Sequence, residues 1–395
     1  MRIVMFYHSL VSDWNHGNAH FLRGVVTELQ SRGHDVRVHE PASSWSREHL
    51  VQQQGERAIA EFSRAYPHLK SERYQLENLD LERALDRADL VLVHEWSDRE
   101  LVEKIGRHRA AGGNYHLLFH DTHHRSVTAR NDMAGYRLEN YDGVLAFGEV
   151  IRERYLAEGW ASRVWTWHEA ADVRVFFPRD AGPAQGDVVW VGNWGDEERT
   201  AELEEFLIRP VEALGVRARV HGVRYPGEAL DRLARAGVEY AGWVANYQVP
   251  EIFAGFHLTL HIPRRPYVRA LPGIPTIRVF EALACGIPLV CAPWDDLEKL
   301  FTPGEDYLIA RDGQGMQDHI AALLADPAGA TAMARRGRDT ILARHTCAHR
   351  VDQLLEIVHR LESGRHDAVP TASPVTSLEL TEDNPVQGRT PVETA

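Results

Sequence analysis

The stretch EAADVRVFFPRDAGPAQG, residues 169–186, divides the chain into two halves with similar sequence patterns. It shows neither helical nor strand periodicity and gathers proline, glycine and aspartate, which is typical of a linker. On either side of it, short apolar runs alternate with amphipathic segments. The chain has 395 residues and so exceeds the size at which one hydrophobic core stops growing, which favours two domains.

Alternation of β-branched apolar runs with helical stretches predicts parallel sheets covered by helices. The predicted strands of the first half are residues 3–8, 36–39, 90–94, 116–120, 144–147 and 164–167. Those of the second half are residues 188–191, 218–221, 239–241, 258–262, 289–292 and 307–310. The predicted helices include residues 21–32, 150–158, 199–214, 276–284 and 348–363. The sequence therefore predicts an α/β protein with two doubly wound, Rossmann-like domains.

The domain boundaries follow from the linker. The first domain is expected to cover residues 1–170 and the second residues 171–345, with a C-terminal helix at residues 346–363. Residues 364–395 are rich in Pro, Thr, Ser, Glu and Val and poor in large apolar residues. Such a segment cannot build a core, so we expect it to be a disordered tail.

Composition excludes several classes of protein. The net charge of −13 argues against bulk binding of nucleic acid, which needs clustered cations. No apolar run approaches the roughly 20 residues of a membrane helix, and the N-terminus has no signal-peptide pattern. The three cysteines lack the spacing of a disulfide framework or a zinc site, which fits a reducing compartment. We therefore expect a cytoplasmic protein without a transmembrane segment.

The loop after the first predicted strand, SLVSDWNHGNAH at residues 9–20, is a candidate acceptor or phosphate loop. Gly17 permits close backbone approach, and Asn18 can cap the helix that follows, whose amides can face an anion. Asp13 and His16 are the polar groups beside them. An ordinary turn explains the same residues equally well. The loop is not G-x-G-x-x-G, which counts against a dinucleotide-dependent enzyme.

The densest polar cluster, HDTHHRS at residues 120–126, follows the fourth predicted strand. Its histidines lack the spacing of known zinc or di-metal motifs, so no metal site is predicted. A His-Asp pair at a strand end suits contact with sugar hydroxyls and proton transfer near neutral pH. His120 and Asp121 are therefore the candidate catalytic residues.

The second half begins with VVWVGNWGDEER, residues 188–199, which predicts a strand, a tight turn at Gly192 and Asn193, and a helix whose first turn carries Arg199. Helix amides and a guanidinium suit a diphosphate. The three consecutive acids in residues 196–198 would be repelled by a diphosphate unless they point away.

The segment PRRPYVRALPGIPTIRVFEALACGIPLV, residues 263–290, is the most specific signal in the chain. A carboxylate on a helix after a glycine loop can accept two hydrogen bonds from a ribose diol, while loop amides receive phosphate oxygens. The donor-binding candidates are Gly273, Ile274, Thr276, Arg278 and Glu281, with Arg224 and Trp243 near the nucleotide base.

These motifs together resemble those of CgeB-like glycosyltransferases, which are close to the GT-B family known as glycosyl transferases group 1. The resemblance covers most of residues 1–345 and rests on SDWNHGNA, RGHDV, FHDTHH, WHEAADVRVFFP, VGNW and RVFEALACGIPLV. It implies two domains facing a central cleft, with C-terminal helices. It also implies that Glu281 binds the donor ribose, that Arg199 and residues 273–276 hold the diphosphate, and that His120 contacts the transferred sugar. In the larger family a second glutamate stands eight positions before the ribose-binding one; here that position is Gly273, so the stereochemistry stays open.

The function predicted is metal-independent transfer of a sugar, of the hexosyltransferase type, from a nucleotide-sugar to an acceptor hydroxyl. The donor is expected to be a UDP- or GDP-sugar serving as co-substrate, with no other cofactor. The acceptor is a glycan, a lipid-linked molecule or a small molecule. Two alternatives stay open: a nucleotide-sugar epimerase of the same architecture, and a non-catalytic carbohydrate-binding protein.

Overall fold

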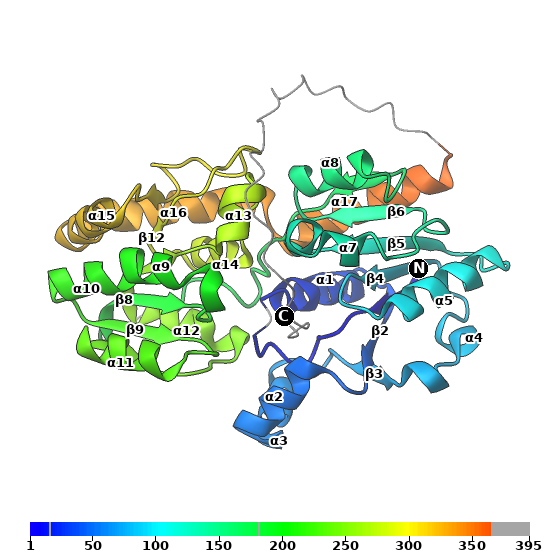
Figure 1. The fold of residues 1–395 in the computed structure, drawn as a ribbon, viewed down its shortest axis with the longest axis horizontal. Coiled ribbons are helices and arrows are strands. Elements are labelled where there is room, and N and C mark those ends of the chain that lie inside the picture. The colour runs from blue at the N-terminus through cyan, green and yellow to red at the C-terminus, as the bar shows by residue number, and fades with distance from the viewer. Residues whose placement is uncertain (16, 181, 365–395) are drawn as a thin grey trace.

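The computed structural model describes residues 1–15, 17–180 and 182–364, and these form two parallel sheets in two lobes (Figure 1). The first sheet has the strand order β3-β2-β1-β4-β5-β6-β7. Its strands are β1 (Arg2–Phe6), β2 (Asp35–Pro41), β3 (Ser71–Tyr74), β4 (Leu90–His94), β5 (His116–Asp121), β6 (Gly143–Ala146) and β7 (Val164–Thr166). All neighbouring strands in this sheet pair in parallel, with β1 between β2 and β4.

The second sheet has the order β10-β9-β8-β11-β12-β13 and is also parallel. Its strands are β8 (Gly186–Val191), β9 (Ala218–His221), β10 (Val238–Tyr240), β11 (Phe256–His261), β12 (Leu289–Cys291) and β13 (Leu308–Ile309). The predicted α/β class with two doubly wound units is therefore confirmed, while the exact domain boundaries stay a prediction.

Helices cover both sheets because each crossover between parallel strands returns along a face of its sheet. In the first half they are α1 (Ala19–Ser31), α2 (Trp45–Gln54), α3 (Glu56–Ala65), α4 (Leu81–Ala84), α5 (Arg99–Ala110), α6 (Arg125–Thr128), α7 (Arg130–Met133) and α8 (Glu149–Ala157). In the second they are α9 (Thr200–Leu203), α10 (Arg209–Leu214), α11 (Gly227–Arg235), α12 (Val249–Ala254), α13 (Arg265–Ala270), α14 (Ile277–Cys285), α15 (Gly313–Ala325) and α16 (Pro327–Arg344). The last helix, α17 (Cys347–Glu362), packs against α1 of the first half (Figure 1).

Two elements differ from the sequence prediction. The helix expected at residues 199–214 consists of α9, a π-helical turn at Glu204–Ile208, and α10. Pro210 near the start of α10 has no amide hydrogen, so the regular helical bond cannot continue through it and the turn widens. The strand β3 was not predicted because its sequence, SERY, is largely polar and lies at the sheet edge.

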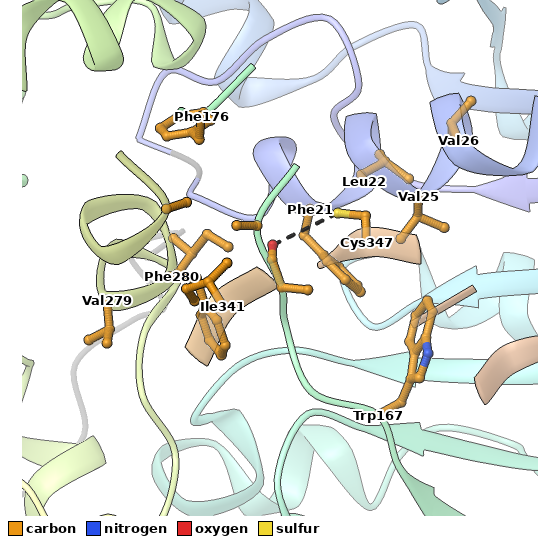
Figure 2. Close-up of a cluster of buried hydrophobic side chains, with 14 of the residues drawn as sticks. Phe21, Leu22, Val25, Val26, Trp167, Phe176, Val279, Phe280, Ile341 and Cys347 are labelled. Carbon is orange, nitrogen blue, oxygen red and sulfur yellow. Dashed lines mark hydrogen bonds between the residues drawn. The ribbon is translucent and has the colours of Figure 1, made fainter. Parts of the chain in front are cut away.

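One hydrophobic core is shared by both halves (Figure 2). It includes Phe21 and Leu22 of α1, Phe280 of α14, and Phe176 of the crossover between the sheets. Cys347 at the start of α17 lies in the same cluster, with its Sγ 3.9 Å from the carbonyl oxygen of Ala170. The crossover therefore passes between the halves rather than over the surface. None of the helices in the described ranges is both long and apolar enough to cross a bilayer.

The predicted tail begins at residue 364, and all of it beyond this residue lies outside the described part of the chain.

Candidate functional site

A cavity of about 160 Å³ lies between the carboxyl ends of the strands of the two sheets. Thr122, directly after β5, and Gly192, directly after β8, line it from the two sides. Ligands of parallel α/β sheets bind at this edge, where loops and helix N-termini converge. The predicted site residues that line this cavity are Gly17, Asn18, Gly192, Asn193, Arg199, Thr276 and Arg278. Those that do not are Asp13, His120, Asp121, Arg224, Trp243, Gly273, Ile274 and Glu281.

The loop after β1 contacts the second half directly. A Cβ at Gly17 would lie 2.9 Å from Cγ2 of Ile277, so glycine allows the close approach expected there, but to α14 rather than to an anion. Asn18 precedes α1, but its side-chain oxygen caps no amide of the helix, and its side-chain NH2 group donates to Thr122 Oγ1. His16 lies outside the described residues.

Asp13 is structural rather than exposed to the cavity. It forms an ion pair with Arg23, at 2.8 Å, and accepts a hydrogen bond of 3.0 Å from the backbone amide of Asn246 in the second half. The two contacts fix the loop after β1 against the second half.

The proposed catalytic pair His120 and Asp121 lies behind the cavity wall. The His120 ring is 1% exposed and shares a 2.7 Å hydrogen bond with the Tyr7 hydroxyl. Burial lowers the pKa of His120 to about 3. Asp121 is fully buried and accepts hydrogen bonds from Tyr155 Oη, at 2.8 Å, and from the His123 amide, at 3.1 Å. Because neither side chain reaches the cavity, a role in proton transfer stays a prediction without direct support from this geometry.

The carboxyl of Asp121 is close to a second buried one, that of Glu95. Burial raises the pKa of Asp121 to about 6, and burial together with the Asp121 charge raises the pKa of Glu95 well above its ordinary value. The Thr122 amide, at 2.9 Å, and Arg125, at 3.8 Å, contact Glu95 from the other side. We interpret Glu95 and Asp121 as structural residues that hold the loop at residues 122–125 in place.

Arg199 lies in the cavity wall but not in the helical turn that was expected. A 3₁₀ turn at Asp196–Glu198 follows the glycine loop, and α9 begins only after Arg199. Its guanidinium donates to the backbone carbonyl of Ile262, at 2.9 Å, and to that of Asn193. Burial lowers the pKa of Arg199 to about 9, so it stays charged at neutral pH.

Two of the three acids of this segment form ion pairs with arginines. Asp196 pairs with Arg224 at 2.9 Å, and Glu198 pairs with Arg264 at 3.3 Å. These ion pairs reduce the repulsion that Asp196 and Glu198 would exert on a bound diphosphate. Arg224 is engaged outside the cavity and lies over the Trp45 ring, near Trp243, in a cluster formed with α2. Contact of Arg224 and Trp243 with a nucleotide base stays a prediction.

The residues of the loop before α14 have different surroundings: Thr276 lines the cavity, whereas Gly273 and Ile274 do not. Gly273 has φ of 91°, a left-handed conformation that favours glycine, and its amide donates to the carbonyl of Asp295 at 2.6 Å. That amide is therefore not free for a phosphate. Ile274 packs into the core of the first half. Thr276 faces the cavity and forms a 3.1 Å hydrogen bond with Nε2 of His261.

Glu281 is fully buried and its carboxylate is already occupied. Oε1 accepts from His20, at 2.9 Å, and from Asn246, at 2.7 Å, while Oε2 accepts from Arg278. Burial raises the pKa of Glu281, but Arg278 and His20 outweigh it, so the pKa lies below its ordinary value. A ribose diol can reach this carboxylate only by displacing one of these partners. The ribose-binding role therefore stays a prediction.

Sequence reasoning missed several cavity residues. Arg264, Tyr267 and Glu169 all line the cavity. The Arg-Arg pair directly after the β11 segment was a usable signal for Arg264, because positive charge at a strand end is a common phosphate contact. Glu169 lies in the WHEAADVRVFFP motif at the start of the crossover, but no role was predicted for it. Within the described ranges, no group of three or more His, Cys, Asp or Glu side chains is placed to hold a metal ion.

Comparison with known protein families gives a match for part of the chain. Residues 199–356 match the glycosyl transferase-like family. This region contains α9 to most of α17 and supplies Arg199, Arg264, Thr276 and Arg278 to the cavity. A search of curated proteins gives no match.

Solved structures share the GT-B fold over nearly the whole chain. Sucrose-phosphate synthase from Thermosynechococcus elongatus is 16% identical, with a TM-score of 0.65 over 92% of this chain and 100% of that one. HepE from Anabaena, in complex with UDP and glucose, is 15% identical, with a TM-score of 0.63 over 91% and 99%. An α-glucosyltransferase in complex with UDP-glucose and DNA is 11% identical, with a TM-score of 0.66 over 91% and 99%. The fold is therefore GT-B, with the cavity between its two sheets.

Proposed function

We propose that this protein is a glycosyltransferase that moves a sugar from a nucleoside diphosphate to an acceptor hydroxyl. The observation that carries the proposal is the convergence of Arg199, Arg264 and Arg278 on one cavity of a GT-B fold. Three guanidinium groups match the charge and the planar geometry of phosphate oxygens. The match of residues 199–356 to the glycosyl transferase-like family supports the same reading.

The arginines explain how the transfer proceeds without a metal ion. As the bond between the anomeric carbon and the diphosphate breaks, negative charge develops on the leaving nucleoside diphosphate. Arg199 is held in place by two backbone carbonyls, so its charge is oriented before the reaction begins. Preorganised positive groups of this kind lower the barrier in a site from which water is excluded.

A UDP-sugar is the first donor to test, and a GDP-sugar the second. HepE and the α-glucosyltransferase were solved with UDP, glucose or UDP-glucose, which supports a UDP-hexose donor here. The acceptor is proposed to be a glycan, a lipid-linked molecule or a small molecule. Within the described ranges the three cysteines are buried and unbridged, which fits action in the cytoplasm.

Donor binding requires the two halves to separate. Sites for small molecules usually measure roughly 300–1,000 Å³, and the cavity here is about 160 Å³. The contacts that narrow it join the halves: the Asn15 and Asn193 side chains are hydrogen-bonded, and Gly17 packs on Ile277. We expect these contacts to open when a nucleotide-sugar enters and to re-form around it.

A thermal-stability screen tests the proposal. UDP, GDP, ADP and CDP are added separately to the full chain, with the corresponding nucleosides as controls. A ligand at one hundred times its dissociation constant adds about 2.7 kcal/mol to the free energy of unfolding. We expect one nucleoside diphosphate to raise the melting temperature by more than its nucleoside does. Equal, negligible shifts for all four diphosphates would contradict the proposal.

A further inference from the structure

Glu169 carries the only carboxylate among the described residues that line the cavity. It lies in the crossover between β7 and β8, where the chain passes from one half to the other. The residue is 3% exposed, and its Oε1 is buried without a hydrogen-bond partner. Buried carboxylate oxygens are usually paired, so an unpaired one in a cavity wall points to a ligand group that completes it.

The backbone that carries Glu169 is held firmly from the other end of the chain. Nε of Arg350, in α17, donates to the carbonyl oxygens of His168, at 2.9 Å, and Glu169, at 3.2 Å. Arg350 is itself 2% exposed, and its carbonyl accepts from the Trp167 indole at 2.8 Å. Helix α17 therefore fixes the backbone from which the Glu169 side chain extends, and a proton-transferring group needs such a fixed position.

The charged groups facing Glu169 come from two helices beside the cavity. Burial raises the pKa of the Glu169 carboxyl to about 8, and the negative charge of Glu281 in α14 adds to the rise. Arg278 of the same helix and the Ile277 amide oppose it. Tyr267 of α13 also interacts with Glu169, and its own pKa is raised mainly by burial. A group with a pKa near the working pH can both accept and release a proton efficiently.

We propose that Glu169 is the general base of the sugar transfer, an inference that rests on the proposed function. The acceptor oxygen forms a bond to the anomeric carbon, and the bond from that carbon to the diphosphate breaks. The electron pair leaves with the nucleoside diphosphate, and the acceptor's hydroxyl proton passes to the Glu169 carboxylate. The leaving diphosphate needs no proton, because Arg199 and Arg278 share its charge.

This assignment replaces the sequence-based candidates with a group that reaches the cavity. His120 and Asp121 would need a relay to exchange a proton with a bound acceptor, since neither lines the cavity wall. Glu169 needs none.

The test measures nucleoside diphosphate release from UDP-glucose, GDP-mannose and ADP-glucose, with water as the acceptor, between pH 6 and pH 9.5. Wild type, Glu169→Gln and Glu169→Asp are compared, with Glu158→Gln as a surface control whose partner is Arg130. We expect wild-type kcat/KM to rise with pH through a pKa near 8. Glu169→Gln should lose roughly a hundredfold or more at pH 8 and show no such rise, while its affinity for the nucleoside diphosphate stays within about threefold.

The outcomes separate this inference from the proposed function. An active wild type with Glu169→Gln within about threefold of it, and with the same pH profile, would overturn the role of Glu169 alone. A wild type that cleaves none of the donors, either in water or with a mixture of sugar acceptors, would overturn both proposals. If circular dichroism shows that Glu169→Gln is unfolded, Glu169→Asp is the deciding variant. Reduced activity with the rise of kcat/KM with pH retained supports the role of Glu169 as the base. Unchanged activity with no such rise contradicts it.

Discussion

The imidazole of His20 in α1 lies 2.9 Å from the Glu281 carboxylate in α14 and joins the two halves of the protein. Its other ring nitrogen, Nε2, accepts a 2.7 Å hydrogen bond from the backbone amide of Asp172. An amide can only donate, so Nε2 carries no hydrogen, and Nδ1 must donate to Glu281. The bridge is therefore a neutral histidine that connects α1, the crossover and α14.

His20→Ala should lower the free energy of unfolding by about 2–4 kcal/mol, because it leaves the buried Asp172 amide without this acceptor, removes one of the three hydrogen-bond donors of the Glu281 carboxylate, and opens a cavity. Urea titration followed by tryptophan fluorescence measures the change. His257→Ala is the control, since His257 is exposed on β11 and its loss should cost at most about 0.5 kcal/mol. Equal midpoints for the two variants would show that the bridge contributes little.

Arg264→Gln should weaken binding of the preferred nucleoside diphosphate by at least about tenfold, since a charge-assisted hydrogen bond contributes roughly 1.5–3 kcal/mol. Arg265→Gln is a closely matched control: the neighbouring arginine does not line the cavity and pairs with Glu202 at 2.8 Å. Calorimetric titration gives both affinities. A loss of similar size in the two variants would argue against direct contact of Arg264 with phosphate.

Glu169→Gln should make the protein less sensitive to alkaline pH. The raised pKa means that the folded state keeps the Glu169 proton up to about pH 8, whereas the unfolded chain releases it near the ordinary pKa of a glutamate. Wild-type stability therefore falls as pH rises between these values, and a neutral glutamine removes that loss.

Urea titration at pH 5 and pH 9 measures the free energy of unfolding of both proteins. Between these pH values, the free energy of unfolding of Glu169→Gln should rise by on the order of 2–4 kcal/mol relative to that of wild type. A constant difference across this range would mean that Glu169 is ionised in the folded protein at both pH values.

Activity should persist in excess EDTA, because the positive charge facing the diphosphate comes from arginines. The measurement is sugar release by enzyme dialysed against EDTA, with and without added manganese or magnesium. Complete loss on dialysis, restored by manganese, would require a metal ion in the mechanism.

Most of the fold could be predicted because its strands are buried on both faces. The runs LVLV in β4 and VVWV in β8 are continuous apolar segments, and this pattern is typical of parallel sheets. The strand β3 lacks it because an edge strand is half exposed and its sequence is polar. The position of α17 on the first half could not be read from local periodicity, since it depends on packing against α1.

The predicted site residues that do line the cavity are those at the end of a strand or near the start of a helix, because the fold fixes where such positions lie. Gly192, Asn193, Thr276 and Arg278 follow strands or begin a helix, and they line the cavity. Side-chain direction was not predictable: His120 belongs to β5 and turns into the core, towards Tyr7. Glu169 lies outside any helix or strand, and its burial depends on packing among both halves and α17, which local sequence does not reveal.

The most direct test of the central claim is to follow each of several nucleotide-sugars by mass spectrometry during incubation with the wild-type protein and a mixture of sugar acceptors. The account predicts that at least one donor, with a UDP-hexose first in order, loses its sugar to an acceptor or to water and appears as the free nucleoside diphosphate. Donors that stay intact, or a donor whose sugar is epimerised while its bond to the diphosphate persists, would contradict glycosyl transfer.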